Sequence, residues 1–180
     1  MKINIKVNNF VLEPFIEDFK LVSFYTVRWD NHELSETDKF IQKFLKHEVL
    51  YKKDLQEILT LIEEIGNERG AKDIYFSRFE ESATALPPSK SLIINGLEIL
   101  FYQNKLRLYC VKITENIVVL FNGGIKSSQK VSDSPDLALK FREAQIFAKK
   151  IWKAILEKDI IVDDAKKQLV SPYNQEEIVL

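Results

Sequence analysis

Cysteine, histidine and glycine are scarce in this chain of 180 residues, and their scarcity excludes several kinds of protein. Cys110 is the only cysteine, so no disulfide can form within the chain, and the apolar alternation LRLYCVKI around it indicates a buried thiol. The sequence contains no Walker lysine loop, HExxH, GxSxG or paired CxxC motif. We therefore expect neither a cofactor nor a metal site.

Long apolar runs are also absent. The first residues, MKINIKVNNF, alternate between apolar and polar side chains, unlike a signal peptide, and no stretch approaches the length of a transmembrane helix. We therefore expect a cytoplasmic protein that makes no membrane contact. An apolar content of 46% suffices for one sizeable core, which favours a single domain over residues 1–180.

The formal net charge of -1 conceals a division of charge along the chain. Residues 101–150 hold nine Lys or Arg against four Asp or Glu, an excess of five positive charges. Residues 1–100 hold 13 basic and 17 acidic side chains, an excess of four negative charges. The balanced total can therefore hide a basic surface of the kind that binds nucleic acid.

Periodicity predicts two strands and two helices in the first part of the chain. Alternation in 2–7 indicates a short strand, and the β-branched and aromatic residues of 21–29 indicate a second one. A near capping box precedes a helix expected over 36–46, and apolar residues at helical spacing predict another helix over 50–66.

Strand-like alternation replaces helical periodicity from about residue 74. We expect a strand over 74–80, a turn-rich connection over 81–91, and an antiparallel meander over 91–124 with a hairpin turn at Asn95-Gly96. A serine followed by proline then marks the start of a long helix over 135–157. The predicted fold class is therefore α+β, an antiparallel meander sheet with two N-terminal helices and a long C-terminal helix.

The strand LRLYCVKI begins with an unusual residue for a central strand, Arg107. Alternation places Arg107 and Tyr109 on one face and Leu106, Leu108 and Cys110 on the other. A strand-end arginine can extend to water without any further role. It can equally face a ligand, so the strand by itself leaves both interpretations open.

The next strand leads into LFNGGIKSSQKVSDSP, residues 120–135. Gly123-Gly124 would permit a bulge or a close backbone approach. If the chain stays extended, Lys126, Ser128 and Lys130 point the same way about 7 Å apart, which is similar to phosphate spacing along a nucleic-acid strand. The alternative is an ordinary surface loop with two solvated lysines.

The order of elements, together with LRLYCVKITENIVVLFNGGIKSSQKVSDSPDLALKFREA (106–144), resembles the RelE/HigB-like toxin superfamily of bacterial toxin–antitoxin systems. Such toxins combine an arginine-led strand, a glycine, lysines and a helix-opening proline, and the matching positions are Arg107, Gly123 or Gly124, Lys126, Ser128, Lys130 and Pro135. Asn122 stands where many relatives carry histidine. The resemblance implies a RelE-like domain with an N-terminal extension over about 1–20 and a C-terminal tail over about 163–180.

The resemblance also implies a ribosome-dependent endoribonuclease that cleaves mRNA by attack of a ribose 2′-OH on the adjacent phosphate. In that reaction we expect Arg107 to stabilise the phosphate, Lys126 to act as base or electrostatic stabiliser, and Lys130 to contact the RNA backbone. The expected RNA-binding residues are Ser128, Lys105, Tyr102 and Tyr109, the tyrosines as surfaces for base stacking. The implied partners are mRNA, the ribosome and a cognate antitoxin of the helix-turn-helix type.

Two other functions stay open at this point. A non-catalytic protein of RelE/ParE fold, either of the topoisomerase-poison type or an inactive toxin, would bind a partner without cleaving RNA. A free-standing RNA-binding domain would spread its basic residues over a broad surface instead of focusing them on one edge of the meander.

Overall fold

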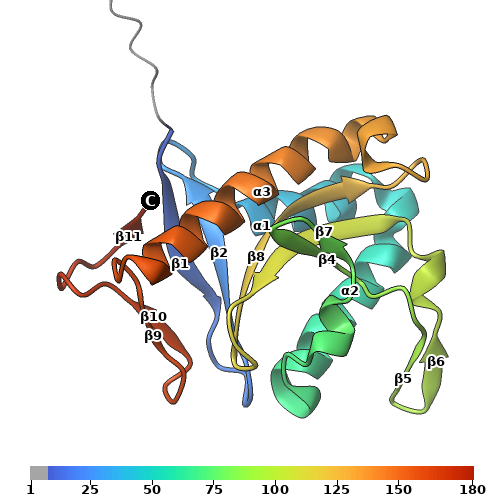
Figure 1. The fold of residues 1–180 in the computed structure, drawn as a ribbon. Coiled ribbons are helices and arrows are strands. Elements are labelled where there is room, and N and C mark those ends of the chain that lie inside the picture. Colours follow the sequence, from blue (N-terminus) through green and yellow to red (C-terminus); the bar gives the residue numbers. More distant parts are fainter. Residues whose placement is uncertain (1–7) are drawn as a thin grey trace, which may run out of the picture.

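A seven-stranded mixed sheet forms the centre of the protein in the computed structural model, which describes residues 8–180 (Figure 1). The strand order is β11-β1-β2-β8-β7-β4-β3. The bounds are β1 Phe10–Ile16, β2 Ser23–Trp29, β3 Phe79–Glu80, β4 Ala83–Leu86, β7 Leu106–Lys112, β8 Ile117–Ile125 and β11 Ile178–Val179. Adjacent strands pair antiparallel, except that β2 and β8 run parallel. The fold is thus α+β. The sheet is larger than the predicted antiparallel meander, because strands from both ends of the chain join it and one pair of strands is parallel.

Helices cover both faces of the sheet (Figure 1). The α-helices are α1 Glu36–Gln42, α2 Lys52–Glu64 and α3 Pro135–Leu156. Single π-helical turns, Lys43–His47 and Ile65–Arg69, extend α1 and α2, and short 3₁₀ turns occur at Val49–Tyr51, Asp73–Phe76, Phe101–Gln103 and Val131–Asp133. Apolar residues of α1 and α2 pack on one face, and those of α3 pack on the other.

Alternation along β7 supplies both cores at once. Leu106, Leu108 and Cys110 belong to the cluster beneath α1 and α2, whereas Tyr109 and Val111 belong to the cluster beneath α3. This is the division that a period of two predicts. Because a helix covers each face, both sets of side chains are buried, and the strand has no solvent-facing side.

The region 74–91 differs from the prediction. The expected strand over 74–80 is a 3₁₀ turn, Asp73–Phe76, followed by the two-residue strand β3. The expected connection over 81–91 contains β4, which pairs with β7 through small, buried residues. Four residues are too few to show a period, and their strand conformation comes from the pairing with β7.

The Asn95-Gly96 turn forms as predicted, but its hairpin stands outside the main sheet. β5 Leu92–Ile94 and β6 Leu97–Ile99 form a separate two-stranded sheet. Asn95 and Gly96 have φ of 51° and 77°, the left-handed values that a two-residue hairpin turn requires. Apolar residues of the hairpin pack against the cluster of α1 and α2 instead of extending the sheet.

The two ends of the described chain also contribute strands. The strand predicted over 2–7 lies outside the described residues. The segments predicted as an N-terminal extension and a C-terminal tail supply β1 and β11, and Phe10 and Leu180 exchange two backbone hydrogen bonds of 2.9 Å. A further hairpin of β9 Ile161–Asp163 and β10 Gln168–Val170 lies between α3 and β11. Within residues 8–180, no helix has the length and apolar character needed to cross a membrane.

Cys110 allows a test of this packing. Its thiol is fully buried, and burial raises the pKa of the thiol to about 12, although a contact with the Thr84 hydroxyl acts in the opposite direction. The native protein is therefore expected to resist alkylation by iodoacetamide at about pH 8, where an exposed thiol reacts. Mass spectrometry across a urea series should detect the adduct only as the chain unfolds. Alkylation without denaturant would contradict the buried position.

Candidate nucleic-acid interface

The glycine pair at the end of β8 allows a close approach of three elements. Gly124 and Gly123 pair in register with Arg107 and Leu108, and the register between β7 and β8 shifts directly before Gly123, between Leu108 and Cys110. A Cβ atom on Gly123 would lie 1.8 Å from the carbonyl oxygen of Arg107, and one on Gly124 would lie 2.4 Å from Oδ2 of Asp136. Side chains at these positions would therefore displace β7 or the start of α3.

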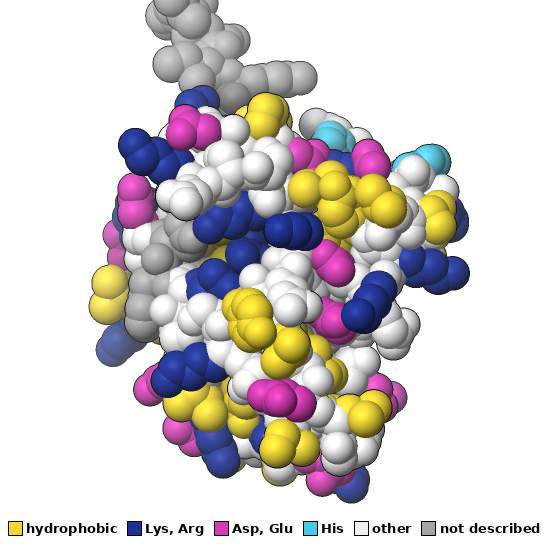
Figure 2. Space-filling model, turned by 90° about the vertical axis from the view of Figure 1, so that its right-hand side faces the viewer, with side chains coloured by type: hydrophobic (Ala, Val, Ile, Leu, Met, Phe, Trp, Pro, Cys, Tyr) yellow, Lys and Arg dark blue, Asp and Glu magenta, His cyan; other side chains and the backbone are white. Residues whose placement is uncertain are grey.

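A shallow pocket of about 340 Å³ lies beside this exit, and we call it the basic pocket. It is lined by Tyr102, Asn104, Lys105, Arg107, Lys126, Ser127, Ser128 and Gln129. Three of these residues are cationic and none is acidic. Figure 2 views the molecule from this side and shows Lys and Arg side chains gathered around a hollow near the middle of the face. All predicted site residues except Lys130 and Tyr109 line this pocket.

Arg107 forms part of the wall of the basic pocket. It is only 7% exposed, and its Nη1 donates hydrogen bonds to the carbonyl oxygens of Asn104, at 2.9 Å, and Leu106, at 2.6 Å. Arg107 is therefore largely buried and does not extend to water, which was one of the two interpretations that the strand left open. Arg107 supplies positive charge from the wall and also holds the neighbouring turn in place.

Lys105 and Lys126 come from the two chain segments that border the pocket. The backbone N–H of Lys126 donates to the carbonyl oxygen of Lys105 at 2.7 Å, so the two residues are directly joined. Lys105 is exposed and Lys126 is half-buried. The backbone bond therefore keeps two cationic side chains close together at the mouth of one pocket.

Lys130 departs from the prediction because the chain does not stay extended after Lys126. The Ser128 hydroxyl donates to the carbonyl oxygen of Lys130 at 2.7 Å, and the Ser128 backbone N–H donates to the Ser134 hydroxyl at 3.1 Å. These bonds turn the loop. Lys130 does not line the pocket, and it is the Lys130 backbone that contacts the Ser128 hydroxyl.

The two tyrosines proposed for base stacking have opposite environments. Tyr109 is completely buried, and its ring contacts that of Phe141 at 5.9 Å between centroids. It cannot stack on a base, so this part of the prediction is wrong, because α3 covers the face of β7 that carries it. Tyr102 is 58% exposed and lines the pocket. Of the two tyrosines, Tyr102 is the one that offers an aromatic surface there.

Asn104 is a lining residue that the sequence analysis missed. Its side-chain amide donates to the carbonyl oxygen of Asp54 at 2.9 Å and to Oε2 of Glu57 at 3.0 Å, and its Oδ1 accepts from the backbone N–H of Leu106. The only sequence signal was the turn dipeptide Gln103-Asn104. That signal predicts a turn but not the contact with α2.

Asn122, at the position of the family histidine, faces away from the basic pocket. Its side-chain N–H donates to Glu36 at 2.9 Å, and Glu36 is 1% exposed and pairs with Lys39 and Lys140. Burial disfavours the charged carboxylate, but the bonds from Lys39 and Asn122 outweigh burial and lower the pKa of Glu36. We call these four residues, Glu36, Lys39, Asn122 and Lys140, the Glu36 cluster.

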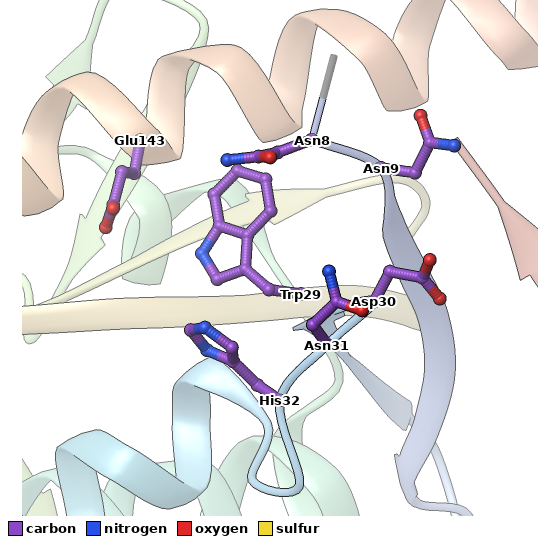
Figure 3. A pocket seen from close by; sticks show the side chains of 7 residues that line it. All are labelled: Asn8, Asn9, Trp29, Asp30, Asn31, His32 and Glu143. Atoms are coloured by element: carbon purple, nitrogen blue, oxygen red, sulfur yellow. The ribbon is translucent and has the colours of Figure 1, made fainter. Parts of the chain in front are cut away.

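A second pocket, of about 400 Å³, has different chemistry (Figure 3). It is lined by Asn8, Asn9, Trp29, Asp30, Asn31, His32 and Glu143. Figure 3 shows the Trp29 indole in the middle of the group, with Glu143 projecting from α3 and His32 from the loop after β2. Two carboxylates in the lining disfavour a phosphate there.

Comparison with protein-family models, with curated proteins and with solved structures gave no match for this chain. Among the side chains that the structure describes, no group of three or more His, Cys, Asp or Glu could hold a metal ion. The basic pocket is the candidate functional site, because its lining of three cations, two serines and two amides suits an anionic ligand with many acceptor oxygens.

Proposed function

We propose that this protein is a toxin of the RelE/HigB-like type, with a RelE-like fold, and that its basic pocket holds the backbone of mRNA for cleavage on the ribosome. The observation that carries the proposal is the convergence of Lys105, Arg107 and Lys126 on one pocket, which serine and amide side chains also line. Phosphodiester binding needs such a concentration of positive charge. A cytoplasmic location and a cognate antitoxin belong to the same proposal.

In the proposed reaction a phosphoryl group is transferred within the RNA, from the 5′-oxygen of the next nucleotide to the 2′-oxygen of the ribose. The ribose 2′-hydroxyl gives its proton to a base and attacks the adjacent phosphorus. The bond to the 5′-oxygen breaks, this oxygen takes a proton from an acid, and the products carry a 2′,3′-cyclic phosphate and a 5′-hydroxyl. Lys126 is the proposed base or electrostatic stabiliser, and Arg107 and Lys105 balance the negative charge that develops on the phosphate.

A translating extract provides the test. Purified protein is added to a defined mRNA and to a copy without a start codon, and the RNA ends are mapped by primer extension. We expect cuts inside the reading frame of the first mRNA, an intact second mRNA, and 5′-hydroxyl ends that accept phosphate from a kinase. An intact first mRNA would reject the nuclease activity.

One observation favours a second candidate, a non-catalytic RNA-binding protein of the same fold. Among the described residues that line the pocket there is no histidine, aspartate or glutamate, and the Ser128 hydroxyl already donates to the Lys130 backbone. Proton transfer would therefore depend on lysine or tyrosine. RNA that is bound by the protein in the same extract but remains uncut would identify this second function.

A further inference from the structure

Two aspartates outside the basic pocket hold the two chain segments that line it. The segments are 102–107, which we call the first rim, and 126–129, the second rim. Oδ2 of Asp54 accepts the backbone N–H of Lys105 at 2.6 Å, and Oδ2 of Asp136 accepts the backbone N–H of Ile125 at 2.6 Å. The first rim is therefore bonded to a carboxylate of α2, and the residue directly before the second rim is bonded to a carboxylate of α3.

Asp54 lies in the first turn of α2, where a carboxylate is compatible with the helix dipole. Its backbone carbonyl also accepts the Asn104 side chain at 2.9 Å, and Glu57, one turn further along α2, accepts the same amide. The first rim thus makes three bonds to one turn of α2. These bonds fix both the backbone of Lys105 and the orientation of Asn104.

Asp136 lies in the first turn of α3, directly after Pro135. Its second carboxylate oxygen pairs with Lys43, at the end of α1, while Gly124 leaves room for its approach to β8. The carboxylate is therefore held from α1 and directed at the last residue of β8. Lys126, the first residue of the second rim, is the next residue after Ile125, whose backbone N–H makes that bond.

The rims are also bonded to each other, through Lys126 N–H and the carbonyl oxygen of Lys105 at 2.7 Å. The spacing of the two lysines consequently depends on where Asp54 and Asp136 place the backbone. We propose that Asp54 and Asp136 are positioning residues, which act on a bound RNA phosphate through Lys105 and Lys126. This inference rests on the proposed function.

The negative charge of these aspartates and their positioning role predict opposite effects of their removal on RNA binding, so a binding measurement separates the two. Neither carboxylate lines the pocket, but each lies within about 10 Å of it through its bonded neighbour, a range at which charges act. If the aspartates acted only by repelling the anion, their removal would strengthen binding. If they position the rims, removal by alanine weakens binding, and asparagine, which retains an acceptor oxygen, preserves it.

The probe is a short single-stranded RNA with 2′-O-methyl groups, which cannot be cleaved by 2′-OH attack, and binding is followed by fluorescence anisotropy. We expect Asp54→Ala and Asp136→Ala each to weaken binding about tenfold, as for one charged hydrogen bond. Asp54→Asn and Asp136→Asn should bind as tightly as the wild type or more tightly. Alanine variants that bind as well as the wild type would overturn the positioning role.

Weaker RNA binding could also result from a general loss of stability in an alanine variant. Hydrogen exchange at individual backbone amides separates such a loss from a local effect on the rims. The amides of Lys105 and Ile125 should exchange faster in the corresponding alanine variant and at the wild-type rate in the asparagine variant, with β1 and β2 as internal reference. Unchanged exchange at both amides would refute the inference. A wild type that does not bind the probe would instead refute the proposed function, and the inference with it.

Discussion

Replacement of Lys105 and Lys126 together by alanine is expected to abolish the growth arrest that the proposed toxin activity should cause when the protein is expressed without the proposed antitoxin. Removal of one group that stabilises the transition state lowers the rate by roughly a hundredfold, and both residues line the basic pocket, the proposed phosphate site. Lys105 is exposed and Lys126 half-buried, so the fold should be retained with a change in stability of about 0.5 kcal/mol. Growth after induction and circular dichroism of the purified variant measure the two effects.

The control for this variant removes the same two charges from another surface. Lys149 and Lys153 lie on α3 and are absent from the pocket lining, so Lys149→Ala with Lys153→Ala should leave the arrest unchanged. Arg107 is a poorer choice, because its loss would also leave the carbonyl oxygens of Asn104 and Leu106 without that donor. Equal toxicity of the Lys105/Lys126 variant and the control would exclude the basic pocket as the active site.

Glu36→Ala is expected to lower the free energy of unfolding by about 3 kcal/mol, the effect of removing one partner from a buried charged network. The Asn122 amide, which is buried, would lose its acceptor, and Lys39 and Lys140 would lose their shared counter-ion. Urea unfolding at neutral pH measures the change. Glu63→Ala, an exposed glutamate of α2, serves as control and should change the midpoint little.

The Glu36 cluster also predicts a pH dependence. Because the pKa of Glu36 is lowered in the folded state, its stabilising effect is complete above the pKa of an exposed glutamate, about 4.3, and is lost as the pH falls through the folded-state value. The difference in stability between the wild type and Glu36→Gln should therefore shrink below about pH 4.3. A difference that stays constant into the acid range would contradict the lowered pKa.

The elements that the sequence predicted well are those with local signals. Alternation identified β7 and β8, Asn95-Gly96 identified a hairpin turn, and Pro135 marked the first residue of α3. β4 was missed because Ala83–Leu86 is too short to show a period, so only its pairing with β7 reveals it as a strand. The parallel pairing of β2 with β8 has no local signal at all.

The candidate site was predictable in part, for a related reason. Local spacing placed Arg107 and Lys126 near each other, because β7 and β8 are adjacent strands. The prediction that Tyr109 stacks on a base failed, because a period of two assigns the side chain to a face of the sheet but does not show that α3 covers this face. The prediction for Lys130 failed, because bonds between Ser128 and the residues around Ser134 turn the loop away from the extended path.

The parallel contact of β2 with β8 joins strands that are separated in the chain by α1, α2 and the β5–β6 hairpin. Closure of so long a loop carries a large entropy penalty, so this central seam should form late and slowly compared with the hairpins on either side. The end of β8 also borders the basic pocket. A nascent chain that has not yet extruded β8 consequently has no complete basic pocket, so any binding by this pocket begins only after β8 has been synthesised and has paired.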